Sequence, residues 1–440
     1  MKKEPKTFYM RTYGCQMNEL DTEVMSGILE RRGLKQVEEE VEADLLIFNT
    51  CSIRDLAERK VMGKVGQLGR KKNRTQIIGI TGCMANAKKE SLFQKLPQID
   101  FLLGTNNIHH LDKVLDEVLY NQEQTIFADE KFYQELDYVN AKRTEKYKAY
   151  VSIIRGCDKY CTYCVVPYTR GPEVSRHPDS ILEECQKLVE KGCQEITLLG
   201  QNVNSYGKDL HEMPILFHDL LYQLDKIEGL NRIRFLTSHP VDITQELMEA
   251  IRDLPSLCEH VHFPLQSGSN RILRKMHRIY TKEEYLSKVS RLKDLVPHVT
   301  LGTDMIVGFP TETEEEFEET MDAMRHVRYG NAFLYTYSPR KGTPAKRWAD
   351  DISENVKHER HQRLLNLHNQ IAAELMKEMI GQEVEILVER RNHKHPSYLK
   401  GLTRCWRNVI FKGEDLLIGT LQKVILRSFT HNTFFAELIS

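Results

Sequence analysis

Short apolar runs alternate with amphipathic segments along the first 120 residues of the chain. Residues 7–13, 44–49 and 77–81 are rich in apolar side chains, and each run is followed by a segment whose apolar positions have helical spacing. Runs of this length bounded by turn residues are typical of buried strands. Strands that alternate with helices predict a parallel sheet with crossover helices. A last strand at residues 101–104 and a helix at 107–120 would complete this unit.

The same alternation continues with longer helices over residues 149–345. The candidate strands are residues 149–155, 195–200, 232–237, 260–265, 300–307 and 333–338. The candidate helices lie near residues 178–191, 214–227, 244–253, 282–295 and 313–328. Six strand–helix units predict a partial (β/α)6 barrel, whose chemistry lies at the C-terminal ends of the strands.

Past residue 353 the pattern changes twice. A long helix is predicted from residue 353 to about residue 379, and after Gly381 short β-prone runs predict a small β-barrel. We therefore expect an α/β protein in four segments. These are an N-terminal parallel-sheet α/β domain at residues 1–120, a polar linker at 121–148, a central partial (β/α)6 barrel at 149–375 and a small C-terminal β-barrel at 376–440.

Three closely spaced cysteines follow the first strand of the predicted barrel. Cys157, Cys161 and Cys164 form the pattern C-x-x-x-C-x-x-C directly after residues 149–155. Three thiolates at this spacing can hold three corners of a cubane iron–sulfur cluster and leave its fourth iron without a protein ligand. A zinc site would need a fourth ligand, for which His177 is the nearest candidate, and a disulfide would leave one thiol over. The pattern favours the open cluster, whose unfilled coordination position can take a substrate.

Three further cysteines occupy equivalent positions in the N-terminal unit. Cys15, Cys51 and Cys83 each follow a predicted strand. The carboxyl ends of parallel strands lie along one edge of the sheet, where ligands bind in such folds. A lone cysteine is most often a buried structural thiol, but three at the same topological position indicate a second three-thiolate metal site.

Composition places the chain among soluble globular proteins. Of its 440 residues 40% are hydrophobic and 28% are charged, and no apolar run approaches the length of a membrane span. Residues 1–6 contain no apolar signal region, so we expect a cytoplasmic protein with no membrane partner. In that compartment the ten cysteines are expected to be thiols or metal ligands rather than disulfides.

Local charge leaves room for an RNA partner although the net charge is only −1. Residues 54–74 carry eight Lys or Arg side chains against Asp55 and Glu58, which fits either a solvated helix face or an RNA contact. The C-terminal barrel has basic and aromatic side chains that suit an RNA-binding module or, equally, a capping domain. They are Lys400, Arg404, Arg407, Arg427, Tyr398 and Trp406.

Other chemistry-bearing side chains are expected in the core. Cys185 lies inside a predicted helix, Cys193 lies at a helix end and Cys258 follows a leucine. Buried thiols of this kind are commonly structural. His260 and His262 alternate on one predicted strand, and we expect both to be buried core histidines.

The motifs around the first six cysteines resemble those of radical S-adenosylmethionine (SAM) methylthiotransferases. The N-terminal motifs are Tyr13-Gly14-Cys15-Gln16-Met17-Asn18, Asn49-Thr50-Cys51-Ser52-Ile53-Arg54 and Gly82-Cys83-Met84-Ala85. The motifs of the barrel are Gly156 to Gly171, Leu199 to Tyr206, Thr237-Ser238-His239-Pro240, and residues 264–269 and 304–310. Residues 380–440 are similar to the RNA-binding TRAM domain of the same enzymes, so the resemblance covers nearly the whole chain.

This resemblance implies two 4Fe–4S clusters. Cys157, Cys161 and Cys164 would bind the cluster whose open iron binds SAM. Cys15, Cys51 and Cys83 would bind an auxiliary cluster that handles sulfur. The expected SAM contacts are Gly200, Gln201, Ser238, Gln266 and Ile306.

The implied activity is that of a transferase that consumes two SAM molecules per product. It would add a methylthio group to C-2 of N6-isopentenyladenosine next to the anticodon in tRNA. The implied partners are this tRNA, an electron donor such as a flavodoxin or ferredoxin, and a sulfur source or cluster-repair protein, and we expect a monomer. Two alternatives stay open: methylthiolation of a threonylcarbamoyl adenosine or a ribosomal-protein aspartate, and a non-catalytic RNA-binding protein with structural metal sites.

Overall fold

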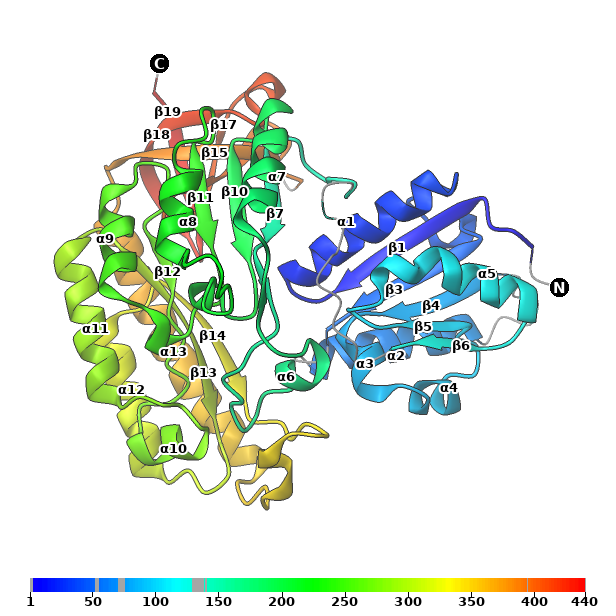
Figure 1. Cartoon of the computed structure of the whole chain (residues 1–440). Helices are drawn as coiled ribbons and strands as arrows, with labels where there is room; N and C mark the ends of the chain where they lie inside the picture. The colour runs from blue at the N-terminus through cyan, green and yellow to red at the C-terminus, as the bar shows by residue number, and fades with distance from the viewer. Residues whose placement is uncertain are drawn as a thin grey trace.

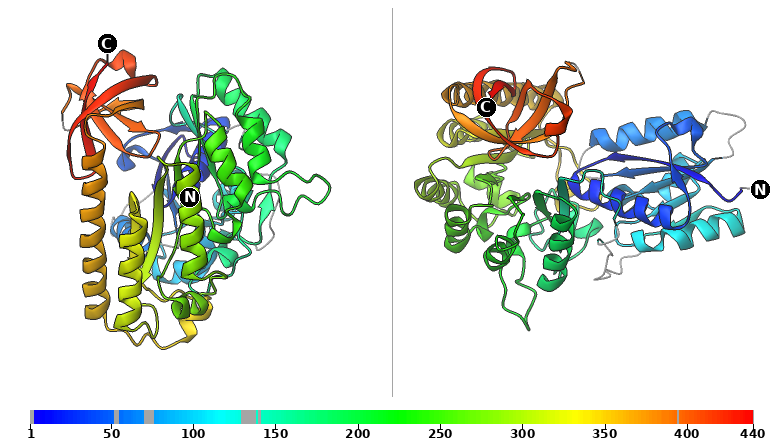
Figure 2. Two further views of the ribbon diagram at one scale, coloured as in Figure 1. Left: turned by 90° about the vertical axis from the view of Figure 1, so that its left-hand side faces the viewer. Right: turned by 90° about the horizontal axis from the view of Figure 1, so that it is seen from above.

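The computed structural model describes residues 3–51, 55–69, 76–128, 138, 141–393 and 395–439. Ser52, Ile53 and Arg54 of the second cysteine motif lie outside the described residues, as do residues 70–74 of the basic run. Figures 1 and 2 show an N-terminal α/β unit, a central strand–helix unit and a C-terminal barrel. The expected α/β class and its three parts are confirmed.

Among the described residues, the N-terminal unit is built on a six-stranded parallel sheet in the order β2-β1-β3-β4-β5-β6. Its strands are β1 (Thr7–Tyr13), β2 (Lys35–Gln36), β3 (Leu45–Thr50), β4 (Ile77–Thr81), β5 (Phe101–Leu103) and β6 (Thr125–Phe127). β6 lies inside the segment that was expected to be a linker, because its backbone pairs with the edge that β5 would otherwise expose. The three strands that precede Cys15, Cys51 and Cys83 are neighbours in the middle of the sheet.

Helices cover both faces of this sheet because side chains of a strand alternate between its faces. Leu45 and Ile47 pack with α1 (Gln16–Arg31) and α5 (Leu111–Asn121) on one face. Leu46 and Phe48 pack on the other face. The helices of that second face are α2 (Asp55–Gly69), α3 (Cys83–Lys88) and α4 (Ser91–Lys95).

The central unit has its strands close to the predicted positions. They are β7 (Lys148–Ser152), β10 (Glu195–Leu199), β11 (Arg232–Phe235), β12 (His260–His262), β13 (Thr300–Val307) and β14 (Asn331–Thr336). The first three and the last three form two parallel ladders, and a bridge between Ile233 and Leu257 lies where the two ladders adjoin. The helices after these strands are α7 (Pro178–Glu190), α8 (Phe217–Leu224), α9 (Gln245–Asp253), α10 (Asn270–Lys275), α11 (Lys282–Leu295) and α12 (Glu314–Val327). This succession is the expected partial barrel.

Three buried cysteines lie in the core of the central unit, as expected. Cys185 is 0% exposed, and Cys193 and Cys258 are each 1% exposed. His260 and His262 are buried as well. These side chains therefore have the structural environment that the sequence pattern predicted.

The C-terminal unit is a closed barrel reached through the long helix α13 (Glu354–Glu378). Its strands are β15 (Glu383–Arg391), β16 (Tyr398–Thr403), β17 (Asn408–Lys412), β18 (Leu421–Thr430) and β19 (Thr433–Leu438). In β16 the buried positions are Leu399, Gly401 and Thr403, which include only one large apolar side chain, so this strand has a weak sequence pattern.

The barrel packs against the N-terminal ends of the central strands. Arg232 is 0% exposed and donates to the Glu385 carboxylate at 2.8 Å. Arg404 binds both carboxylate oxygens of Glu259 at 2.8 and 2.9 Å. The Trp406 ring stacks on His260 with centroids 5.4 Å apart.

Arg404, Arg407 and Trp406 therefore lie in an interdomain contact rather than on an RNA-facing surface. Arg407 donates to the Gly330 carbonyl at 2.9 Å, next to the start of β14. These three side chains make the kind of contact that a capping domain makes, which is one of the two roles that the composition of the barrel left open. A sequence does not reveal which wall of a barrel meets the neighbouring domain.

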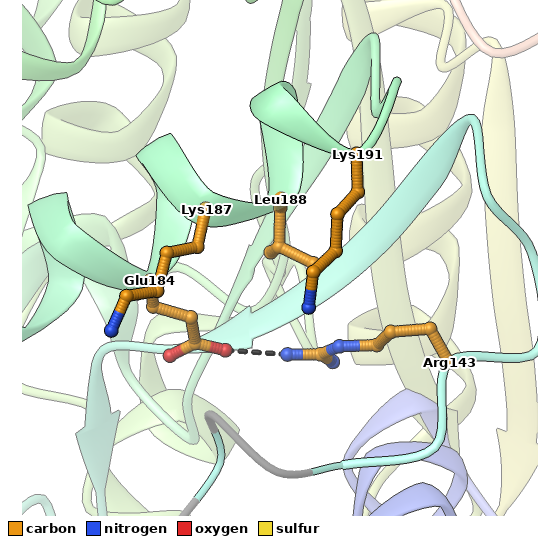
Figure 3. A pocket seen from close by; sticks show the side chains of 5 residues that line it. All are labelled: Arg143, Glu184, Lys187, Leu188 and Lys191. Atoms are coloured by element: carbon orange, nitrogen blue, oxygen red, sulfur yellow. Dashed lines mark hydrogen bonds and ion pairs between the residues drawn. The ribbon is translucent and has the colours of Figure 1, made fainter.

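The N-terminal unit is tied to the central unit by Arg143, in the segment before β7. Its guanidinium donates to Glu23 of α1 at 3.1 Å and to Glu184 of α7 at 2.5 Å. Figure 3 shows this arginine and the small cavity beside it, lined also by Lys187, Leu188 and Lys191. The cavity measures about 20 Å³, which is room for one water at most. It is a packing feature of the contact between the two units.

In the described residues, no helix is both long and apolar enough to cross a membrane.

Candidate active site

The barrel's cysteine loop leaves the C-terminal end of its first strand through Gly156. This residue has φ of 77°, and a Cβ there would lie 1.7 Å from the Pro172 carbonyl oxygen, so only glycine fits. The two ends of the loop are held by the antiparallel strands β8 (Ile154–Arg155) and β9 (Val174–Ser175). The Cys157 amide donates to the Gly171 carbonyl at 3.1 Å, which closes the loop.

Cys157, Cys161 and Cys164, here called the loop trio, lie near enough to one another to interact electrostatically. Arg278, which is buried, donates to Cys161 Sγ at 3.3 Å. The Val166 amide donates to Cys164 Sγ at 3.5 Å. Burial raises the pKa of Cys157 and of Cys164 to about 12. These thiols are therefore neutral by themselves, and a bound metal would have to displace their protons.

Cys15, Cys51 and Cys83, here called the sheet trio, lie at the ends of β1, β3 and β4. The strands are in register there, with Tyr13 opposite Thr50 and Asn49 opposite Thr81. Cys15 caps the N-terminus of α1 and Cys83 begins α3. The sheet edge thus gathers three thiols that are far apart in the sequence.

The sheet trio has a different electrostatic environment from the loop trio. A hydrogen bond with Cys51 lowers the pKa of Cys15 to about 7 and that of Cys83 to about 6, and the Arg170 charge acts in the same direction. The shared hydrogen bonds with Cys15 and Cys83 raise the pKa of Cys51 in turn. Thiolates are the metal-binding form of cysteine, so this edge is prepared for a cation.

Each trio offers three cysteine sulfurs, the donor type that iron–sulfur clusters use. Among the described residues, no group of three or more His, Cys, Asp or Glu side chains is placed to hold one metal ion. A 4Fe–4S cluster makes a different demand, because each cysteine binds a separate iron. All ten cysteines are described, and none forms a disulfide.

Arg170 connects the two trios. It follows the loop trio in the chain, and its Nη2 donates to Asp21 Oδ2 of α1 at 2.8 Å. The preceding residue, Thr169, accepts hydrogen bonds through its carbonyl from Asn86 and Thr105, both at 3.1 Å. The segment after the loop, including α6 (Val166–Thr169), therefore packs directly on the unit that carries the sheet trio.

The five expected SAM contacts lie at the C-terminal ends of the barrel strands, on the same side as the loop trio. They are Gly200, Gln201, Ser238, Gln266 and Ile306. Gln201 Oε1 accepts from the Gly156 amide at 2.6 Å, so this side chain braces the cysteine loop. Ile306 packs in a small apolar cluster with Tyr163.

Two observations at these strand ends fit a polar ligand. Ser238 Oγ, Asn202 Oδ1 and His239 Nε2 are buried and have no hydrogen-bond partner among the described residues, which is costly unless a ligand or water binds them. Thr237 and Gln266 have φ of 68° and 73°. A positive φ is uncommon for a residue with a β-branched or long side chain, and such strained backbone positions are found more often at functional sites.

Sequence reasoning missed several residues of this region. Arg278 and Asp242 gave no signal, and Asp304 was noted only as part of the motif at residues 304–310, because their partners in this region are distant in the chain. Asp242 is 2% exposed and pairs with Lys159 of the cysteine loop at 2.8 Å. Asp304 on β13 lies 2.8 Å from His262.

Comparison with known proteins agrees with this geometry. Residues 7–104 match the model of the uncharacterized protein family UPF0004, and residues 151–324 match that of the radical SAM superfamily. A radical S-adenosylmethionine methyltransferase, TsrM, from Kitasatospora setae has been solved with cobalamin and a 4Fe–4S cluster bound. It has a similar fold, with a TM-score of 0.55 over 90% of this chain and 81% of that chain at 12% identity.

Curated relatives extend the similarity to nearly the whole chain. A tRNA-2-methylthio-N(6)-dimethylallyladenosine synthase of Protochlamydia amoebophila is 66% identical over 433 residues, which are 98% of this chain and 96% of the relative. A protein of the same name from Thermoanaerobacter pseudethanolicus is 46% identical over 98% of this chain and 92% of its own length. The chain therefore belongs to the family of tRNA-2-methylthio-N(6)-dimethylallyladenosine synthases, within the radical SAM superfamily.

Proposed function

We propose that the protein adds a methylthio group to C-2 of N6-isopentenyladenosine next to the anticodon in tRNA. The observation that carries this proposal is the pair of separate cysteine trios joined through Arg170, in a chain 66% identical to a relative named for this product. The target C–H bond is aromatic and has no acidity that a side-chain base could use, so a cofactor must supply the reactivity.

The loop trio would hold one 4Fe–4S cluster and the sheet trio a second, auxiliary one. When bound, these groups supply one-electron cleavage of SAM to a 5′-deoxyadenosyl radical and the sulfur that is transferred, with two SAM molecules used per product. Gly200, Gln201, Ser238, Gln266 and Ile306 would hold SAM. Residues 1–120, 149–375 and 376–440 would act as the auxiliary-cluster domain, the radical SAM core and a TRAM-like RNA-binding barrel.

The side chains around the trios have distinct tasks in this proposal. Arg278 donates to the sulfur of Cys161 and so orients one ligand of the loop trio. Arg170 holds the unit with the sheet trio against the barrel mouth. The reaction requires that water and competing hydrogen donors are kept away from the radical.

The partners follow from the same chemistry. They are the isopentenylated tRNA, an electron donor such as a flavodoxin or ferredoxin, and a sulfur source or cluster-repair protein. We place the enzyme in the cytoplasm and expect it to act as a monomer.

The test separates the two trios. Anaerobically prepared protein should carry about eight iron atoms per chain. Cys157→Ala should abolish SAM cleavage, whereas Cys15→Ala should leave cleavage and abolish sulfur insertion, as measured by mass analysis of tRNA nucleosides. Cys193→Ala, which removes a buried thiol outside both trios, should retain both activities.

Each contrary result has a clear meaning. Methylthio product from the Cys15 variant would refute the role given to the sheet trio. Product on a threonylcarbamoyl adenosine or a ribosomal-protein aspartate, with none on isopentenyladenosine, would refute the proposed substrate.

A further inference from the structure

A basic groove lies between α2 and β1, on the face of the N-terminal sheet opposite α1 and α5. It is open, has a volume of about 410 Å³ and is called the α2 groove below. Its lining includes Arg11, Tyr13, Arg59, Lys60, Gly63 and Lys64. Neither the cysteine trios nor the expected SAM contacts use these side chains.

The groove is lined by four cations that come from two elements. Lys60 and Lys64 are four positions apart on α2 and therefore lie on one face of it, and Arg59 lines the groove beside them. Arg11 and Tyr13 share a face of β1, and the Arg11 guanidinium lies 5.6 Å from the centre of the Tyr13 ring. All four charged residues of the lining are cations, and Lys64 pairs with Glu40 at 2.7 Å.

Gly63 leaves the floor of the groove open. Glycine destabilises a helix interior relative to alanine, yet a Cβ at this exposed position would meet no described atom within 4 Å. Packing within the protein therefore does not require a glycine here. A ligand whose backbone approaches the helix closely would require one, since such close approach is a recurrent use of glycine.

The groove ends beside the sheet trio. Tyr13 lies two residues before Cys15, and its carbonyl accepts from the Cys51 amide at 3.0 Å. A chain-like ligand in the groove is thus led toward the proposed site of sulfur transfer. Arginine forks and lysines bind phosphates, and an aromatic ring beside them can stack on a base.

We propose that the α2 groove binds the phosphate backbone of the RNA substrate, an inference that rests on the proposed function. An acidic protein reductant is the competing occupant. RNA fits better because the lining combines cations with an aromatic ring, whereas a stable protein interface needs a broad patch with an apolar centre.

The first test measures the affinity of the cluster-loaded, full-length enzyme for fluorescently labelled isopentenylated tRNA over a series of salt concentrations. Each phosphate contact adds about 0.7–0.9 to the slope of log affinity against log salt. Lys60→Gln should weaken binding and reduce that slope by about 1, and Arg59→Gln/Lys60→Gln by about 2. Lys113→Gln makes the same charge change on α5, on the opposite face of the sheet, and should leave both quantities unchanged.

The second test uses shape rather than charge. Gly63→Ala should keep or raise the melting temperature, because alanine favours the helix, and should weaken tRNA binding several-fold by filling the floor. Gly66→Ala makes the same change three positions on, where the Cβ would touch only Leu96 at 4.0 Å. This control should raise the melting temperature in the same way and leave tRNA affinity unchanged.

The outcomes distinguish this inference from the proposed function. The Arg59, Lys60 and Gly63 variants could bind tRNA with the affinity and salt slope of the wild type, while the wild-type enzyme forms methylthio product. That result would refute only the proposal that the α2 groove binds RNA. Slower SAM cleavage with an acidic protein reductant, at unchanged tRNA affinity, would assign the groove to that partner and also overturn the inference. Absence of methylthio product from the wild-type enzyme would instead refute the proposed function.

Discussion

Arg170 donates a hydrogen bond to Asp21 across 2.8 Å, and only 3% and 1% of these two side chains are exposed. The pair joins the segment after the loop trio to α1, which begins next to Cys15. It is therefore a structural link between the two candidate cluster sites. A buried ion pair is costly to break from one side, because the remaining charge loses its partner.

Arg170→Gln should lower the free energy of unfolding by about 3–5 kcal/mol, the usual loss when one member of a buried pair is removed. Anaerobic urea unfolding of the cluster-loaded protein measures this. Arg170→Gln/Asp21→Asn removes both charges and should recover part of the loss. A double variant that loses as much stability as Arg170→Gln and Asp21→Asn lose in sum would mean that the pair is not coupled.

The sheet trio should titrate at lower pH than ordinary thiols in metal-free protein. A hydrogen bond with Cys51 and the Arg170 charge lower the pKa of Cys15 to about 7 and of Cys83 to about 6. Thiolate should thus be present above about pH 7 and should be lost as the pH falls through about 7 and then about 6. Ultraviolet absorbance of thiolate in chelated, anaerobic protein reports these steps. Cys83→Ser should remove the titration step at the lowest pH. Arg170→Gln, made separately, should raise the midpoint pH of both steps, and unchanged midpoints in the Arg170 variant would contradict the role of Arg170.

Arg278 should be needed for the loop trio although it is not a ligand. Its three nitrogens donate to Cys161 Sγ, the Pro264 carbonyl and the Tyr280 hydroxyl at 3.3, 3.2 and 2.9 Å. Arg278→Lys keeps a cation but cannot reach all three acceptors, and loss of such a supporting contact typically costs about 10–100-fold in activity or metal affinity. SAM cleavage rate and iron content should both fall. Arg325→Lys, at an exposed pair with Asp322, is the control, and a normal rate in the Arg278 variant would refute this role.

Arg404 should contribute to stability and not to tRNA binding. Arg404→Gln removes the double hydrogen bond to Glu259, whose partners are 23% and 33% exposed, and should lower the free energy of unfolding by about 1–2 kcal/mol. Salt-dependent tRNA affinity should stay unchanged. Arg427→Gln breaks an exposed pair with Glu437 and should leave stability unchanged. A reduced salt slope in the Arg404 variant would show instead that this arginine contacts RNA.

The sequence pattern predicted most of the architecture because strand and helix periodicities are local. The unbroken apolar run from Leu45 to Phe48 predicted a buried strand, and the structure covers it on both faces. The position of Cys51 after that strand placed its thiol at the sheet edge. The equivalent placement of Cys15 and Cys83 followed from the same rule for parallel sheets.

Contacts between units could not be predicted in the same way. Arg170 and Asp21 are 149 positions apart, and no local pattern marks either as a partner of the other. Trp406 reads as an exposed aromatic side chain of a small barrel, but it stacks on His260 because that wall of the barrel meets the central strands. These relationships depend on how whole domains dock.

The docking of the C-terminal barrel has a practical consequence. Its strands shield the fully buried Arg232 and receive Met376 from α13 into their apolar interior. A truncated enzyme lacking residues 376–440 would bare this surface as well as lose whatever RNA the barrel holds. Loss of modification after such a truncation would therefore report misfolding and lost recognition together, and only point substitutions can separate them.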